Sequence, residues 1–231
     1  MSTISKATVL SIKEYGSDIR EYLLKLDKNY YFEAGSFLLL TLDVRDSYSR
    51  WPESRNFSIA SAYNKEGTIK LIIRRVGEYT GRIFNELLVG SKCVVKYSFG
   101  DFLLPFIDKK SPICCIAGGT GIAPILSFCE QLKSETQSER LHIFYSFKNE
   151  EELLGLKILE KTVSNGFLHL FCTRKSMEGT INRRIAWNDI QDEILDCSSS
   201  HYYICGGEDF TSYFKDNLIN VGAENIYTDE W

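Results

Sequence analysis

The sequence predicts two domains in series: an antiparallel Greek-key β-barrel over residues 1–107, and a doubly wound α/β domain with a parallel sheet over residues 108–231. Short β-rich runs separated by turn residues fill the first part, whereas strands and helices alternate after Pro105. The chain becomes polar at residues 106–110 and then reaches Pro112, which marks the boundary between the two patterns.

The first part contains six runs rich in β-branched and aromatic residues, bounded by turn signals such as Tyr15-Gly16-Ser17 and Ala34-Gly35-Ser36. One helical interruption is expected at residues 81–88. Six short strands of this kind are typical of a closed or nearly closed antiparallel barrel. The expected strands are residues 7–13, 19–26, 37–42, 56–61, 68–75 and 93–98.

The second part begins with a continuous apolar run at residues 113–117, of the kind that is buried on both faces of a parallel sheet. Helical spacing follows at residues 124–132. Continued alternation of strands and helices is typical of a doubly wound domain. Further strands are expected at 141–145, 168–172, 202–205 and 226–228, and further helices at 150–163, 184–195 and 209–221.

The composition, 44% hydrophobic and 25% charged, is typical of a soluble globular protein. Lys6, Lys13 and Glu14 interrupt the N-terminus before the apolar core of a signal peptide could form, so we expect a cytoplasmic protein. The charge-free stretch 111–129 contains three glycines and Pro124 in mid-course, which argues against a membrane span. We expect a monomer that neither inserts into a membrane nor binds nucleic acid.

Seven cysteines occur without CxxC spacing, and most lie inside apolar runs, so we expect reduced, buried thiols. The CxxxxCxxC spacing of a plant-type iron–sulfur cluster is missing. Each of the three histidines lies in or beside an apolar segment without a second ligand at metal spacing, and we expect no metal site.

Two short segments carry residues suited to nucleotide chemistry. AGGTGIAP, from Ala117 to Pro124, lies between a buried strand and a helix, where glycines let the backbone approach a phosphate group. Arg55-Asn56-Phe57-Ser58 opens a strand and supplies a cation for a diphosphate, an aromatic side chain for a planar ring and a hydroxyl. Taken singly, the first is also compatible with a plain tight turn and the second with an ordinary edge strand.

The order of several segments along nearly the whole chain resembles the ferredoxin–NADP reductase superfamily. The segments are RNFSIAS, TGRIFNEL, FGDFLLP, AGGTGIAP, CGG and a C-terminal Trp. This resemblance implies an FAD-binding barrel followed by an NAD(P)-binding domain, and an enzyme that transfers hydride from NADPH or NADH to the flavin.

The resemblance also implies the flavin site. Arg55 would contact the FAD diphosphate, Phe57 would flank the isoalloxazine in place of the usual Tyr, and Ser58 would lie near flavin N5. Gly81 to Phe84 would form a second diphosphate turn through backbone N–H groups. Because Phe84 stands where Ser or Thr is usual, a lost hydrogen bond would weaken FAD binding by about 1 to 2 kcal/mol. The full set of implied FAD contacts is Arg55, Asn56, Phe57, Ser58, Ile72, Ile73, Arg74, Gly81, Arg82, Ile83, Phe84, Thr120 and Trp231.

For the nicotinamide nucleotide, the resemblance implies a glycine turn, a thiol beside the nicotinamide and a cationic site for the 2′-phosphate of NADPH. A solvated basic face is the alternative for the last of these. Trp231 would stack on the flavin and move away for hydride transfer, and Ser58, Cys205 and Asp229 would shape the reaction site. The implied nucleotide contacts are Gly119, Thr120, Gly121, Lys148, Thr173, Arg174, Arg184, Cys205 and Gly206.

The electron acceptor is expected to be an acidic carrier, a ferredoxin or flavodoxin. Residues 1–107 hold 15 Lys and Arg against 12 Asp and Glu, whereas residues 108–231 hold 12 against 19. The basic first part, with Arg45, Arg50, Arg74, Arg75 and Arg82, suits such a partner. Alternatives are a reductase that uses free flavin as substrate, a reductase component of an oxygenase, and a flavin- or nucleotide-binding module without turnover.

Overall fold

The computed structural model describes residues 3–45, 50–105, 108, 110–163, 167–192 and 199–230. The chain divides into two compact units, Met1–Leu103 and Leu104–Trp231. The polar segment that marks the change in sequence pattern begins a few residues beyond this division. None of the described helices is long and apolar enough to cross a membrane.

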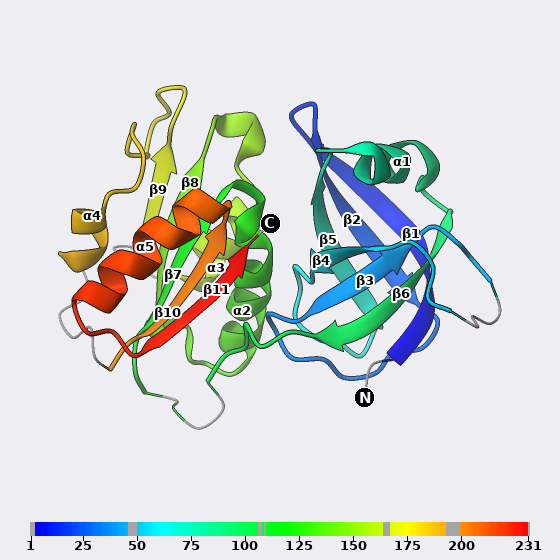
Figure 1. Cartoon of the computed structure of the whole chain (residues 1–231), viewed down its shortest axis with the longest axis horizontal. Helices are drawn as coiled ribbons and strands as arrows, with labels where there is room; N and C mark the ends of the chain where they lie inside the picture. The colour runs from blue at the N-terminus through cyan, green and yellow to red at the C-terminus, as the bar shows by residue number, and fades with distance from the viewer. Residues whose placement is uncertain are drawn as a thin grey trace. The chain divides into compact units, whose positions relative to one another are not determined.

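The first unit is a six-stranded antiparallel sheet that curls into a near-barrel (Figure 1). The strand order is β4-β3-β6-β1-β2-β5, and a bridge between Ile59 and Leu71 links the two ends of the sheet. Among the described residues of this unit, six strands and one helix confirm the pattern expected from the sequence, with ends shifted by a few residues. They are β1 (Thr3–Tyr15), β2 (Ile19–Leu26), β3 (Phe37–Thr41), β4 (Arg55–Ser58), β5 (Thr68–Arg74), α1 (Glu78–Glu86) and β6 (Lys92–Phe99).

Buried and more exposed side chains alternate along the strands of this unit, and the buried ones form its core. In β2, Tyr22 and Leu24 are fully buried whereas Lys25 between Leu24 and Leu26 is exposed. Helix α1 covers one opening with Tyr79 and Ile83, which belong to the same apolar cluster. Each fully buried aliphatic side chain contributes about 1.5 to 3 kcal/mol, so the barrel is a stable frame for the loops at its rim.

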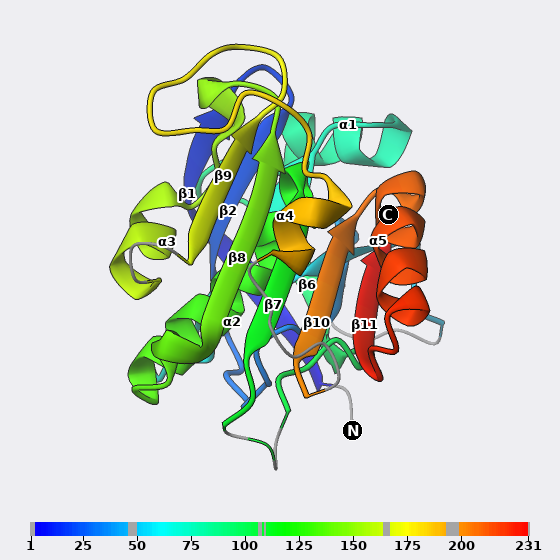
Figure 2. The ribbon, with the colours of Figure 1, turned by 90° about the vertical axis from the view of Figure 1, so that its left-hand side faces the viewer.

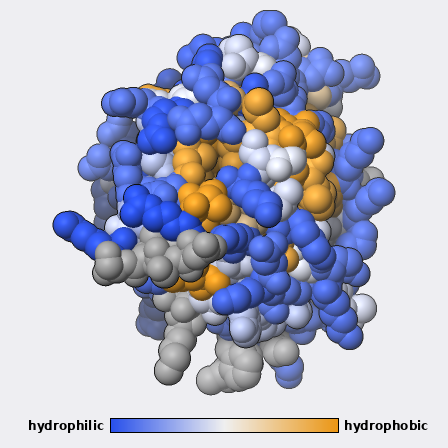
Figure 3. Space-filling view, turned by 90° about the vertical axis from the view of Figure 1, so that its right-hand side faces the viewer, coloured by the Kyte–Doolittle hydropathy of each residue, from blue (hydrophilic) through white to orange (hydrophobic). Residues whose placement is uncertain are grey.

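Apolar side chains also gather on the outer surface of this unit. A bulge between Val9 and Ser11 accompanies the outward placement of Leu10, which is 46% exposed. Hydrogen bonds of Val9 with Gly90 and Ser91 bring the exposed Leu88 and Val89 beside this bulge. Figure 3 shows apolar surface bordered by hydrophilic residues on the face that it views. Apolar patches of modest size are common on the surfaces of monomeric proteins.

The second unit is a five-stranded parallel sheet in the order β11-β10-β7-β8-β9 (Figure 2). The alternation of strands and helices confirms the expected doubly wound arrangement. Its strands are β7 (Ile113–Gly118), β8 (Leu141–Phe147), β9 (Leu168–Cys172), β10 (His201–Gly206) and β11 (Asn225–Glu230). Its helices are η1 (Gly119–Gly121), α2 (Ile122–Ser134), η2 (Ser138–Arg140), η3 (Glu150–Glu152), α3 (Leu156–Thr162), α4 (Trp187–Gln191) and α5 (Glu208–Asn220).

Both faces of this sheet are covered by helices, which explains its apolar strands. Cys114 and Ile116 belong to one apolar cluster with Phe214 of α5. On the opposite face, Phe128 of α2 packs edge-on against Tyr203 with ring centroids 4.9 Å apart. The six described cysteines, Cys93, Cys114, Cys115, Cys129, Cys172 and Cys205, are buried and unpaired by disulfides.

Candidate functional site

The strand order of the parallel sheet creates a switch point between β7 and β10. From β7 the chain proceeds outward through β8 and β9, and it then returns to the other side of β7 to form β10 and β11. Loops that leave the carboxyl ends of two such strands diverge, which opens a crevice where ligands of α/β sheets bind. The glycine-rich turn after β7 and the Cys205-Gly206-Gly207 segment at the end of β10 both lie at this point.

The glycines at the switch point are required by close packing. A Cβ atom on Gly121 would collide with the carbonyl oxygen of Cys205 and lie 2.6 Å from its carbonyl carbon. A Cβ on Gly206 would lie 2.7 Å from the Phe210 ring. Gly119 has a φ of 57°, which favours glycine. The turn therefore lies directly against the end of β10.

Two helices begin at this switch point, and their first turns differ in charge. Helix α2 starts with Ile122 and Ala123 and has no acidic residue in its first turn, whereas α5 starts with Glu208 and Asp209. Free N–H groups and the helix dipole attract anions to a helix N-terminus, and acidic side chains there already compensate that field. A diphosphate therefore fits the start of α2 and is disfavoured at α5.

Cys205 and Asp229 lie opposite each other on the adjacent parallel strands β10 and β11. The Cys205 thiol lies 3.8 Å from Asp229 Oδ2, within hydrogen-bond distance for sulfur. Cys205 is only 1% exposed. The structure thus brings two of the four residues expected at the reaction site into contact. Trp231, the third, lies outside the described residues.

Basic residues gather where β8 and β9 end. The N–H of Arg174 donates to the carbonyl of Lys148 at 2.9 Å, and Thr173 donates through its N–H and its hydroxyl to the Phe147 carbonyl. Arg174 is exposed, and Lys148 lies 3.6 Å from Glu152. Three of the four residues expected around a 2′-phosphate are therefore neighbours in space.

The third expected cation, Arg184, is exposed, and no described contact links its side chain to Lys148 or Arg174. The side chain of its neighbour Arg183 is instead held by contacts with other residues of the same unit. Both Arg183 amino groups reach the Asp189 carboxylate, at 2.6 and 2.5 Å, and the guanidinium lies 5.5 Å from the Phe171 ring centroid. The hydrogen bond from Arg183 is the main cause that lowers the pKa of Asp189.

In the first unit, strand register separates the residues of the RNFS segment. Phe57 pairs with the buried Leu38 and packs against the core of the barrel, whereas Ser58 pairs with Phe37 and lies on the other face of β4. Arg55, at the start of the strand, lies with its guanidinium 4.7 Å from the Tyr79 ring centroid. The segment therefore presents Arg55 at the rim of the barrel, and Asn56 and Ser58 on its outer face.

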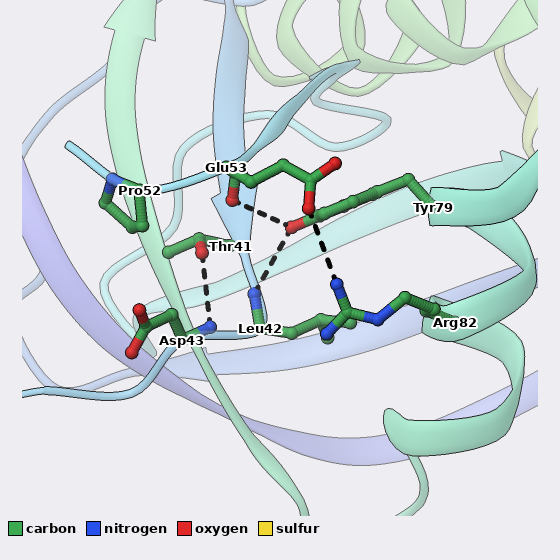
Figure 4. Close-up of a pocket in the computed structure, with 7 residues that line it drawn as sticks. All are labelled: Thr41, Leu42, Asp43, Pro52, Glu53, Tyr79 and Arg82. Atoms are coloured by element: carbon green, nitrogen blue, oxygen red, sulfur yellow. Dashed lines mark hydrogen bonds and ion pairs between the residues drawn. The ribbon is translucent and has the colours of Figure 1, made fainter.

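A cavity of about 320 Å³ opens beside this rim (Figure 4). The Tyr79 hydroxyl lies 3.1 Å from the Leu40 carbonyl and 3.2 Å from the Glu53 carbonyl, and it accepts from the N–H of Leu42 at 3.3 Å. Burial is the main cause that raises the pKa of this hydroxyl. The cavity is lined by Thr41, Leu42, Asp43, Pro52, Glu53, Tyr79 and Arg82.

Gly81 to Phe84, which the resemblance implies as a second diphosphate turn, lie inside α1. The N–H of Gly81 donates to the Gly77 carbonyl at 2.8 Å inside α1, and Ile83 and Phe84 are buried in the core, so this backbone is not available to a diphosphate. The first turn of α1 runs from Glu78 to Thr80, and the N–H groups of a helix's first turn have no carbonyl four residues earlier in the helix to bond. The Thr80 hydroxyl caps this end by accepting from the N–H of Gly77 at 3.0 Å.

Ile72, Ile73 and Arg74 lie on β5, at the end of the sheet order. Ile72 and Ile73 are buried, and Arg74 pairs with Asp18 at 2.7 Å with a side chain only 12% exposed. These three side chains are therefore buried in the barrel or paired with another of its residues. Contacts of this segment with a cofactor would have to use the backbone edge of the strand.

The residues at the barrel rim fit the diphosphate of FAD. Two guanidinium groups, from Arg55 and Arg82, lie 4.7 and 5.7 Å from the ring centroid of Tyr79, which belongs to the first turn of α1, and these side chains are 51% and 43% exposed. Tyr79, Thr80 and Glu53 were not predicted from the sequence. The spacing of Gly77 and Thr80 is a detectable capping signal, whereas the Tyr79 contacts join residues far apart in the chain and leave no local signal.

Comparison with known proteins gives consistent matches along the chain. A model of the oxidoreductase NAD-binding domain matches residues 115–216. A CDP-6-deoxy-L-threo-D-glycero-4-hexulose-3-dehydrase reductase of Yersinia pestis is 26% identical over 94% of this chain and 65% of its own length. The reductase subunit of an aromatic O-demethylase from Amycolatopsis is 30% identical over 65% of this chain and 45% of its own length. The chain thus spans less than two thirds of these relatives.

Solved structures share the fold. A cytochrome P450 reductase from Amycolatopsis matches 99% of this chain and 70% of its own with a TM-score of 0.83 and 22% identity. A ferredoxin NADP+ reductase from Neisseria gonorrhoeae, with bound FAD and NADP, matches 99% of this chain and 98% of its own with a TM-score of 0.79 and 20% identity. Residues 115–216 therefore belong to the oxidoreductase NAD-binding domain family, and the chain as a whole is similar to ferredoxin reductase-type FAD- and NAD-binding oxidoreductases, which are related to the reductase components of oxygenases.

Proposed function

We propose that the chain is an NAD(P)H-dependent flavin oxidoreductase that accepts hydride from NADPH, or NADH, through FAD and passes electrons to a ferredoxin- or flavodoxin-type carrier. The observation that carries the proposal is the glycine turn at the switch point, which approaches the end of β10 so closely that Gly121 cannot bear a side chain. It lies within the region matched by the NAD-binding model.

In the second unit, we assign the nucleotide diphosphate to Gly119, Thr120 and Gly121 with the start of α2. The absence of acidic residues in the first turn of α2 supports this assignment. Lys148, Thr173 and Arg174 would hold the 2′-phosphate, which distinguishes NADPH from NADH. Arg184 joins this set only as an exposed cation of the same segment.

In the first unit, we assign the FAD diphosphate to Arg55, Arg82 and the first turn of α1. Bound FAD would supply the group that accepts hydride and later releases electrons. Asn56 and Ser58, on the outer face of β4, would contact the isoalloxazine, and Phe57 would support this strand from the core side.

Cys205 and Asp229 would orient the nicotinamide. Their hydrogen-bonded contact couples the ends of two strands, and burial of the thiol makes this a position from which water is excluded. We keep Trp231 as a residue that would cover the flavin until nicotinamide binds. Neither role requires a general acid or base.

The proposed electron acceptor rests on the charge of the first unit and on the names of related proteins. Arg50 and Arg75 are exposed on the first unit, whereas Arg45, Arg74 and Arg82 already pair with Asp43, Asp18 and Glu86. The electrostatic argument for an acidic carrier therefore rests on fewer cations than the sequence count implies. Relatives named as reductase components of dioxygenase systems favour an oxygenase component as the second candidate acceptor.

One experiment tests cofactor and activity together. The purified chain should show the visible absorption of bound oxidised flavin, and anaerobic NADPH should bleach it faster than NADH. Ferricyanide should then restore the absorption. A chain that binds FAD but is never reduced by either nucleotide would instead be a binding module. A chain that oxidises NAD(P)H only when free flavin is added in excess would be a flavin reductase.

A further inference from the structure

We propose that Glu53 competes with the diphosphate of FAD for Arg55 and Arg82 and thereby sets how tightly the chain holds its flavin. This inference rests on the proposed function, because it takes the barrel rim as the FAD site. Glu53 belongs to none of the sequence motifs described above. Its role follows from the position of its carboxylate between two cations.

The carboxylate of Glu53 is shared between the guanidinium groups of Arg55 and Arg82. Glu53 Oε1 lies 3.4 Å from Arg55 Nη2, and Glu53 Oε2 lies 3.5 Å from Arg82 Nη1. One carboxylate oxygen therefore faces each guanidinium. Figure 4 shows the Glu53 side chain extending across Tyr79 toward Arg82 at the edge of the cavity. A diphosphate that used both arginines would need the same two donor groups.

The backbone holds Glu53 at this position. Its carbonyl lies 3.2 Å from the Tyr79 hydroxyl, which is itself bonded to the backbone of β3 at Leu40 and of Leu42 just beyond it. The carboxylate can rotate into solvent, since the side chain is 59% exposed, but it cannot leave the neighbourhood of the two arginines. Its charge therefore stays close to any anion bound there.

Arg82 also pairs with Glu86, and this second ion pair uses different nitrogen atoms of the guanidinium from the one that faces Glu53. Glu86, one helical turn away, takes the Nε and Nη2 edge at 2.9 and 3.4 Å, and Nη1 is left for Glu53. A phosphate oxygen can replace Glu53 at Nη1 while Glu86 keeps Arg82 oriented. Displacement of Glu53 breaks two exposed ion pairs, each of which has a modest free energy, so its removal should tighten FAD binding by roughly 2- to 10-fold.

The test uses Glu53→Gln, which keeps the side-chain size and the backbone contact with Tyr79 but removes the charge. Fluorescence titration of the flavin-free chain would measure Kd for FAD, which carries the diphosphate, and for riboflavin, which carries no phosphate. Glu14→Gln is the matched control, because Glu14 is an exposed carboxylate of the same unit that pairs with Arg20 at 2.9 Å.

The expected result is a Kd for FAD lowered roughly 2- to 10-fold in Glu53→Gln only, no change for riboflavin, and a smaller gain at high salt because exposed charges are screened. An unchanged or raised Kd for FAD, or an equal gain for riboflavin, would overturn the role of Glu53 and leave the proposed function intact. Failure of every variant and of the unmodified chain to bind FAD would overturn both.

Discussion

Gly121 offers a sharp test of the packing of the glycine turn against β10 in the second unit. Its φ of −61° is accessible to any residue, so alanine would meet no backbone strain of its own. The added Cβ would nevertheless collide with the Cys205 carbonyl oxygen, lie 2.6 Å from the carbonyl carbon and lie 3.1 Å from the Gly206 nitrogen. All three are backbone atoms of a central strand, so they cannot move aside as a flexible side chain would.

The expected cost follows from these contacts. Overpacking of a well-packed interior by a methyl group costs about 1 to 3 kcal/mol, and a collision with backbone atoms belongs to the upper part of that range. The turn and the end of β10 must separate, and this displaces the N–H groups at the start of α2. We therefore expect Gly121→Ala to lower stability by about 3 kcal/mol and to weaken NAD(P)H binding at least 10-fold.

Two glycines at the same switch point are matched controls. The nearest atoms to a Cβ on Gly118 would be those of the Phe210 ring, at an ordinary contact distance of 3.6 Å, and a Cβ on Gly207 would meet nothing within 4 Å. Urea unfolding followed by circular dichroism, together with titration of NADPH, would compare the three alanine variants. If Gly121→Ala matched Gly118→Ala in both unfolding midpoint and NADPH affinity, the close approach of turn and strand would be refuted.

Three further outcomes are expected. Arg174→Ala should raise Kd for NADPH about 10-fold and leave Kd for NADH unchanged, because it removes a charge-assisted contact with the phosphate. The control Lys215→Ala, on α5, should alter neither Kd. Equal effects of Arg174→Ala on both nucleotides would contradict the assignment. Arg55→Gln should raise Kd for FAD about 10-fold without changing riboflavin binding, as flavin titration would show. Hydrogen bonds from Ser111, with Lys110 and His201, hold the pKa of Asp108 well below its usual range. The low pKa of Asp108 stabilises the folded chain above about pH 4, and this contribution is lost as the pH falls toward the depressed pKa. Asp108→Asn should therefore make the free energy of unfolding depend less on pH below about pH 4. An unchanged pH dependence of unfolding in this range would contradict the role of Asp108.

Much of the fold could be predicted because local pattern and tertiary environment agree. Residues 113–117 are a continuous apolar run, and β7 is buried on both faces between α2 and α5. Alternation in β2 places Tyr22 and Leu24 inside the barrel. Helix ends were less predictable: the expected helix at 150–163 is a 3₁₀ turn at Glu150–Glu152 followed by α3, because Gly155 adopts a φ of 67° between them.

The sequence by itself determined the two kinds of sheet, their order and the glycine turn, because periodicity and glycine spacing are local properties of a chain. Only the tertiary structure decided that α1 begins three residues before Gly81, that Arg183 is committed to Asp189, and that Glu53 reaches both Arg55 and Arg82. The physical reason is that ion pairs and hydrogen bonds depend on through-space distances between segments, and strand register and helix phase set those distances only when the whole unit packs.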